Sequence, residues 1–289
     1  MVAANGARFH VAVAGEGPLV LFLHGFPEFW WAWRHQLPAV AAEGFRAAAM
    51  DLRGYGASDK PPRGYDPTTL AADVAGVIRS LGVRDAVVVG HGWGGLVAWT
   101  VAVAAPDQVR RVAVVSMAHP RRLRIAMLSD PQQVKASRHI LGFQRPVLPE
   151  RQLVADDGAF VGHLLRLWSG PDWPDEATEA QYRRVVQVPG VAHCALESYR
   201  WAVRSLPRPD GIRYARRMRT PVTVPTLQVH GGLAGGPVLP SSAQGSGRYV
   251  DAPYRWRLMP DVGHFPHEED PDAFNAELVG WLRDPEPDR

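Results

Sequence analysis

Short apolar runs alternate with amphipathic runs over the first 120 residues of the chain. Five runs have the length and composition of strands: Arg8–Ala14, Leu19–Leu23, Arg46–Met50, Ala86–Val89 and Val112–Met117. The fourth of these is apolar throughout, which is typical of a strand buried on both faces of a parallel sheet.

Helical spacing separates the predicted strands. In Leu70–Leu81 the apolar residues recur three or four positions apart, so they share one face of a helix, and Gly82 ends it. Gly94–Ala104 is a second predicted helix, with Pro106 just past its end. The alternation of strands and helices predicts an α/β fold with a doubly wound, mostly parallel sheet.

The alternation stops after Pro120 and returns about a hundred residues later. The intervening residues are helical in character and rich in Arg, Pro and Trp. Thr226–His230 and Trp256–Met259 then read as strands, and Pro271–Leu282 as a closing amphipathic helix.

We therefore expect one core domain, residues 1–120 and 219–289, interrupted by a helical segment, residues 121–218. The polar tail Pro285–Arg289 is predicted to be frayed.

Composition and charge are ordinary for a globular protein, with 46% hydrophobic and 21% charged residues and a formal net charge of +3. No nucleic-acid motif and no long unbroken apolar stretch is present, so we expect neither a nucleic acid nor a membrane as partner. Residues 1–5 lack the features of a secretory signal, and Cys194 is the only cysteine, which we interpret as a core thiol. These features predict a cytoplasmic protein.

One predicted strand-to-helix turn has the pattern of a nucleophile elbow. Residues 87–95 read VVVGHGWGG, so Gly90 and Gly94 flank a central Gly92. Small flanking residues are needed because the central backbone is strained and lifted above the sheet. An ordinary strand–helix turn is the alternative.

A second turn, His24–Glu28, follows the strand Leu19–Leu23 and presents the backbone N–H of Phe26. Paired with the N–H of Trp93, it would form an oxyanion hole with two donors. Near the end of the chain, residues 263–269 read GHFPHEE and place His264 in a late loop.

In this order, the motifs resemble those of the α/β-hydrolase superfamily and, within it, the epoxide hydrolases. The specific markers are HGFPEFWWAWR from His24 and GH-x-WGG from Gly90. The resemblance implies an α/β-hydrolase fold with a helical cap inserted after the sixth strand. It also implies a pocket for a small apolar molecule, such as an epoxide or ester, in a monomer or homodimer that uses no cofactor and no metal ion.

Two positions that carry the family's chemistry are changed. Epoxide hydrolases place an aspartate at the elbow, whose carboxylate opens the epoxide to an ester; Gly92 stands there in this chain. For the acid that orients the histidine, Ala234 is the best match, or Gly235 if the loop carries an extra residue. Only His264 remains from the triad, either as a general base or as a histidine kept for packing.

The cap also departs from the family pattern. Tyr199 matches one of the two tyrosines that hydrogen-bond the epoxide oxygen, and His139 falls where the other is expected. Histidine can still donate a hydrogen bond, although both residues could instead be structural. The predicted ligand-lining residues are Phe26, Pro27, Trp30, Trp93, His139 and Tyr199.

Three functions fit these observations. The first is a ligand binder without hydrolytic machinery, because removing the nucleophile of a serine protease costs about 10⁶ in turnover. The second is an enzyme with other chemistry, in which His264 is the base and Tyr199 the acid; direct attack by water on an epoxide, elimination, isomerisation and cyclisation all qualify. The third is a partner-binding protein. We favour the first two jointly, a small-molecule pocket protein whose covalent route is disabled.

Overall fold

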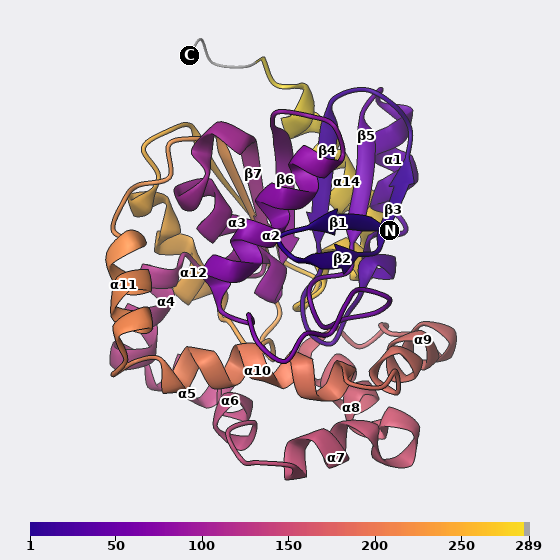
Figure 1. Cartoon of the computed structure of the whole chain (residues 1–289), viewed down its shortest axis with the longest axis vertical. Coiled ribbons are helices and arrows are strands. Elements are labelled where there is room, and N and C mark those ends of the chain that lie inside the picture. Colours follow the sequence, from indigo (N-terminus) through magenta and orange to yellow (C-terminus); the bar gives the residue numbers. More distant parts are fainter. Residues whose placement is uncertain (286–289) are drawn as a thin grey trace.

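One seven-stranded sheet forms the centre of the protein (Figure 1). The computed structural model describes residues 1–285, so the predicted tail Pro285–Arg289 lies outside the described residues except for its first member. Along the sheet the order is β3-β5-β4-β6-β7-β8-β9, and β1 pairs with β2 in a separate hairpin. The strands are β1 (Val2–Ala4), β2 (Ala7–Phe9), β3 (Val11–Ala14), β4 (Leu19–Leu23), β5 (Arg46–Met50), β6 (Ala86–His91), β7 (Val109–Val115), β8 (Thr226–Gly231) and β9 (Tyr254–Met259).

The sheet is parallel apart from its edge pair β3–β5. Every residue of β4, β6 and β8 is buried, as expected for central strands covered on both faces. Helix α1 (Gln36–Ala42) packs against α14 (Pro271–Arg283), and α2 (Pro67–Ser80) packs against α3 (Gly92–Ala104). The α/β-hydrolase fold and its mostly parallel sheet are thus as predicted.

The expected strand Arg8–Ala14 is broken at His10. The N–H of His10 donates to Ser58 Oγ and its carbonyl accepts from the N–H of Asp51, so the chain leaves one hairpin and joins the large sheet there. Because the hairpin adds strands, the helical insert follows the seventh strand along the chain, β7, rather than the sixth.

The helical insert lies between β7 and β8. Figure 1 shows α7 to α10 gathered at one end of the sheet. Its helices are α4 (Pro120–Ser129), α5 (Pro131–Ala136), α6 (His139–Gly142), α7 (Leu148–Val154), α8 (Ala159–Trp168), α9 (Glu176–Val186), α10 (Val191–Arg204) and α11 (Pro209–Arg217). Within residues 1–285, the helices are too short or too polar to cross a bilayer.

The remaining helical segments are short. They are η1 (Trp30–Trp33), η2 (Pro106–Gln108), η3 (Ala155–Gly158), α12 (Pro240–Ala243), η4 (Gln244–Tyr249) and α13 (Pro266–Glu269).

Candidate functional site

The turn from β6 into α3 is as sharp as its glycines predict. Gly92 begins α3 and has a φ of +51°. A Cβ added at Gly90 would lie 2.2 Å from the carbonyl oxygen of Gly94, and one added at Gly94 would lie 2.2 Å from that of Leu23. Both flanking positions therefore exclude any side chain, as the elbow pattern requires.

The central position differs from its neighbours because it has room. A Cβ on Gly92 would meet only Gly25 Cα at 3.5 Å and His264 Nε2 at 3.7 Å, which are ordinary contacts. A side chain at residue 92 would therefore point at the imidazole of His264. The structure brings these two predicted site residues together from distant parts of the chain.

His264 is buried, with 4% of its surface exposed. Its backbone N–H donates to the carbonyl of Trp168 in the helical insert. Its Nδ1 makes no hydrogen bond with any described residue. Burial, followed by the nearby His91 and His230, holds the pKa of His264 well below its ordinary value, so the ring is neutral at pH 7.

The loop after β8 places a different residue beside this imidazole than we expected. Ala234 and Gly235 are exposed, and a Cβ on Gly235 would point at the carbonyl oxygen of Leu167, 2.8 Å away. Gly236 is buried, and a Cβ there would lie 3.2 Å from His264 Cβ, a tight contact, and 3.5 Å from His264 Nδ1. The loop turns inward only at Gly236, a feature that a run of small residues does not reveal in sequence.

The predicted oxyanion donors lie next to this space. Gly25, which a Cβ on Gly92 would touch, precedes Phe26, and the N–H of Phe26 has no hydrogen-bond partner among the described residues. Trp93 is the second residue of α3, where backbone N–H groups have no partner within the helix.

An aromatic cluster from the core and the insert lies over the bend. The Tyr199 ring is 5.4 Å from that of Phe26 and 5.0 Å from that of Trp93, between ring centroids. Burial raises the pKa of the Tyr199 hydroxyl above its ordinary value, so the hydroxyl stays protonated. The His139 ring belongs to the same cluster, with its centroid 5.7 Å from that of Tyr199. Phe143 and Trp168 also contact the Phe26 ring, and sequence reasoning did not assign them to the site.

Pro27, Trp30 and Cys194 complete the residues singled out in the sequence, and of these Trp30 lies away from the Tyr199 cluster. Pro27 is buried directly after Phe26. Trp30 is half-buried, and its ring contacts those of His10 and Phe29 rather than the cluster around Tyr199. Cys194 is a buried thiol that accepts a hydrogen bond from the Tyr65 hydroxyl, and burial raises its pKa.

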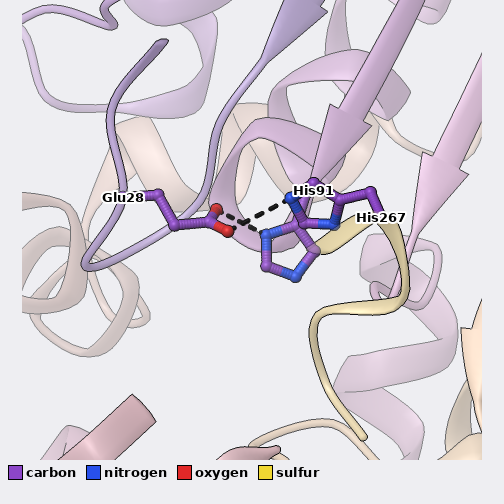
Figure 2. Close-up of side chains that lie close together, drawn as sticks. All are labelled: Glu28, His91 and His267. Carbon is purple, nitrogen blue, oxygen red and sulfur yellow. Dashed lines mark hydrogen bonds and ion pairs between the residues drawn. The ribbon is translucent and has the colours of Figure 1, made fainter. Parts of the chain in front are cut away.

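A charged cluster that sequence reasoning missed lies beneath the bend (Figure 2). Glu28 Oε2 is 2.6 Å from His91 Nδ1, and it also accepts from the N–H of Gly25. His91 Nε2 lies 2.9 Å from the backbone carbonyl of His264. His267 Nε2 is 3.2 Å from the other oxygen of Glu28.

Hydrogen-bond directions fix the charges in this cluster. Burial alone would raise the pKa of Glu28, but His91 and His267 hold it well below its ordinary value, so it is a carboxylate. A carbonyl oxygen only accepts, so His91 Nε2 donates to His264, and Nδ1 must donate to the carboxylate. His91 is therefore an imidazolium in a fully buried ion pair with Glu28.

Glu28, His91 and His267 are also residue types that bind metal ions. Their ligand-type atoms lie within 4.8 Å of one another. Two ligands of a tetrahedral zinc ion lie about 3.3 Å apart, given bonds of about 2.05 Å. The 2.6 Å between Glu28 Oε2 and His91 Nδ1 is shorter and is a hydrogen bond. This arrangement fits an ion pair better than a metal centre.

Buried neutral histidines predict a loss of stability in acid. Burial lowers the pKa of His119 to about 3 and those of His139, His230 and His267 to about 4. Between pH 6.5 and 4 the unfolded chain therefore binds protons that the folded chain does not, so the free energy of unfolding falls as the pH falls. Urea titrations at pH 7.5 and 5.5 measure this. An equal free energy of unfolding at the two pH values would contradict the lowered pKa values of these buried histidines.

The chain belongs to the alpha/beta hydrolase family, whose model matches residues 20–277. It is 33% identical to epoxide hydrolase 4 of Mus musculus over 97% of this chain and 77% of that protein. It is 32% identical to epoxide hydrolase 3 of Xenopus tropicalis over 97% and 76%.

Solved structures of epoxide hydrolases have the same fold as this chain. Epoxide hydrolase A from Mycobacterium thermoresistibile superposes with a TM-score of 0.81 at 30% identity, covering 98% of this chain and 97% of that one. A mutant Bacillus megaterium epoxide hydrolase, complexed with its product (R)-3-[1]naphthyloxy-propane-1,2-diol, gives 0.84 at 25% identity, covering 97% and 99%. The protein is thus an epoxide-hydrolase-like member of the family.

Proposed function

We propose that the protein binds a small, largely apolar molecule of the epoxide class and does not use the covalent hydrolytic route. In this proposal residues 121–218 act as a cap over a core of residues 1–120 and 219–289. The ligand lies among Phe26, Trp93 and Tyr199, whose rings cluster over the bend at Gly92. Sites lined by aromatic side chains suit apolar ligands.

One observation carries the proposal. The side-chain direction of residue 92 leads straight to His264 Nε2, and Gly92 offers only hydrogen there. Without a carboxylate at this point no ester intermediate forms, so the imidazole has nothing to hydrolyse. Gly236 likewise leaves His264 Nδ1 without an acid.

The test uses the ligand of the relative as a probe. We expect 3-(1-naphthyloxy)propane-1,2-diol to bind in isothermal titration calorimetry, and 1-naphthyl glycidyl ether to be hydrolysed no faster than in buffer. Tyr199→Phe should weaken binding up to about tenfold, since one hydrogen bond contributes about 0.5–1.5 kcal/mol. Rapid hydrolysis with an enzyme ester trapped in mass spectrometry would overturn the proposal, and so would the absence of binding.

A second function is supported by the position of His264 Nε2, which would lie 3.7 Å from a Cβ on residue 92. A water molecule held there could attack an epoxide directly, with His264 as general base, Tyr199 as acid and the N–H groups of Phe26 and Trp93 stabilising the oxyanion. The lowered pKa makes His264 a weak base, so turnover would be slow. This route predicts a low activity that His264→Ala abolishes; an activity that survives the substitution excludes it.

A further inference from the structure

The motif that carries His264 also carries two adjacent acids, Glu268 and Glu269, which the proposed function does not use. Their side chains bond to different partners. Glu268 is buried and bonds to Arg34 of the core and to Tyr182 of the helical insert. Glu269, the last residue of α13, bonds instead to the loop that holds His264.

The Glu269 carboxylate accepts hydrogen bonds from three backbone N–H groups. Its Oε2 is 2.7 Å from the nitrogen of Gly263, and its Oε1 is 2.8 Å from that of Phe265. These two donors stand immediately before and after His264. The same Oε2 is 2.7 Å from the nitrogen of Gly170 in the helical insert. A charged acceptor makes such bonds about twice as strong as those between neutral groups, and all three donors belong to buried residues.

The helical insert and the His264 loop are in direct backbone contact at this point. The N–H of His264 donates to the carbonyl of Trp168 at 2.8 Å. A Cβ on Gly263 would lie 2.6 Å from the same carbonyl oxygen, so no side chain fits between the two segments. The Trp168 ring also contacts those of His264 and Phe26, with 5.9 and 6.3 Å between ring centroids. Glu269 therefore joins the loop that holds the imidazole to a segment that contacts the candidate site.

The direction of the His264 ring depends on this backbone. Every N–H of residues 263–265 is hydrogen-bonded, two to Glu269 and one to Trp168. In a catalytic triad an acid orients the imidazole through Nδ1. Here Nδ1 makes no hydrogen bond with any described residue, and Gly236 stands where such an acid would be. The bonds to the neighbouring backbone are thus the polar contacts that fix the place of the ring.

We propose that Glu269 is a positioning residue that holds the His264 imidazole toward residue 92 and in a fixed place relative to the insert. It acts through the backbone on both sides of His264 and does not contact the ligand. The inference rests on the proposed function in one respect, namely that the His264 ring belongs to the ligand site.

The test follows the Cε1–H signal of His264 by NMR between pH 6 and 8 in the ligand-free protein, with His264→Phe to assign the signal. In the wild type the signal should not titrate, because burial holds the pKa of His264 well below its ordinary value. Glu269→Ala removes the acceptor of three N–H groups, so the loop should open and expose the ring to water. The pKa should then rise toward its ordinary value of about 6.5, and the signal should titrate.

This measurement separates a change in position from a loss of stability. The titratable groups around the ring are the same in every Glu269 variant; they are Glu28, His91, His230 and His267. A rise in the pKa of His264 therefore reports a change in the surroundings of the ring. Lower stability alone does not produce it, because folded and unfolded chains give separate signals.

Glu269→Gln is the conservative variant. Its one carbonyl oxygen still accepts from Gly170 and Gly263, but its NH₂ group faces the N–H of Phe265, and two donors do not bond. The pKa of His264 should therefore lie between those of the wild type and of Glu269→Ala. This variant decides the question where Glu269→Ala yields too little folded protein.

Asp270→Ala is the matched control, since it removes the next carboxylate along the chain, which accepts from the N–H of Ala273 at the start of α14. It should leave the His264 signal as in the wild type. The inference is wrong if His264 stays untitrated in both Glu269 variants, or if Asp270→Ala raises its pKa equally. Addition of 3-(1-naphthyloxy)propane-1,2-diol to the wild type should shift the same signal; a signal that stays in place would overturn the proposed function, while the ligand-free spectra still decide the role of Glu269.

Discussion

Gly92→Asp combined with Gly236→Asp should give the protein epoxide hydrolase activity that the wild type lacks. A Cβ at residue 92 already meets His264 Nε2 at an ordinary 3.7 Å, and one at residue 236 lies 3.5 Å from Nδ1. The first carboxylate would attack the epoxide and the second would orient the imidazole. The positive φ at residue 92 makes any side chain there strained by about 1–2 kcal/mol, which a folded protein of this size tolerates.

The expected gain in turnover is large because the loss of a nucleophile lowers turnover severely. In subtilisin the loss of the nucleophile costs about 2 × 10⁶ in turnover and the loss of the acid about 3 × 10⁴. An unoptimised restoration should recover part of this, and we expect an increase of at least about a hundredfold in the rate of diol formation. Chromatography of the products of 1-naphthyl glycidyl ether measures it.

The control is Gly92→Asp with Ala234→Asp, which adds the same two charges. Ala234 is exposed, so its carboxylate would not reach the buried imidazole. The pair with residue 236 should be clearly faster than the pair with residue 234. Equal rates would show that Gly236 is not the position facing Nδ1, and inactivity of both folded pairs would show that the bend does not aim residue 92 at His264.

Glu28→Gln should destabilise the protein far more than the removal of a surface charge such as that of Glu43. The substitution leaves His91 without its counter-ion, and removing one partner of a buried pair costs about 3–5 kcal/mol. His91 also bonds to the backbone of His264, so the loop carrying that residue should loosen. For a chain of this length we expect the melting temperature to fall by about ten degrees.

Glu43→Gln provides the comparison, because Glu43 pairs with the mostly exposed Arg283. Surface pairs of this kind contribute about 0–1 kcal/mol. Both variants are measured by thermal unfolding and urea titration. Similar losses in the two would mean that Glu28 and His91 do not form the charged pair that the hydrogen bonds indicate.

Local sequence patterns predicted most of the fold. The strands Leu19–Leu23 and Arg46–Met50 have the predicted bounds, since apolar runs of that length have few other ways to be buried. Glycines at alternate positions also predicted the bend at Gly92, because close backbone approach leaves a visible pattern. The break at His10 was missed, since it depends on hydrogen bonds to Asp51 and Ser58, far along the chain.

The site was less predictable because its remaining parts depend on directions in space. Gly236 and Ala234 both lack an acidic group, and only the path of the loop decides which of them faces His264. Trp30 belongs to a conspicuous aromatic motif, yet its ring turns toward His10.

The three glycines of the bend differ in the substitutions that they tolerate. A Cβ at Gly90 or Gly94 would clash with a carbonyl oxygen, so substitutions there would prevent folding. A side chain at Gly92 meets no clash and has only the strain of the positive φ to overcome. Among the three glycines of this five-residue stretch, substitution is therefore confined to residue 92, the position that faces the His264 imidazole. The scaffold stays one substitution from regaining a reactive group there.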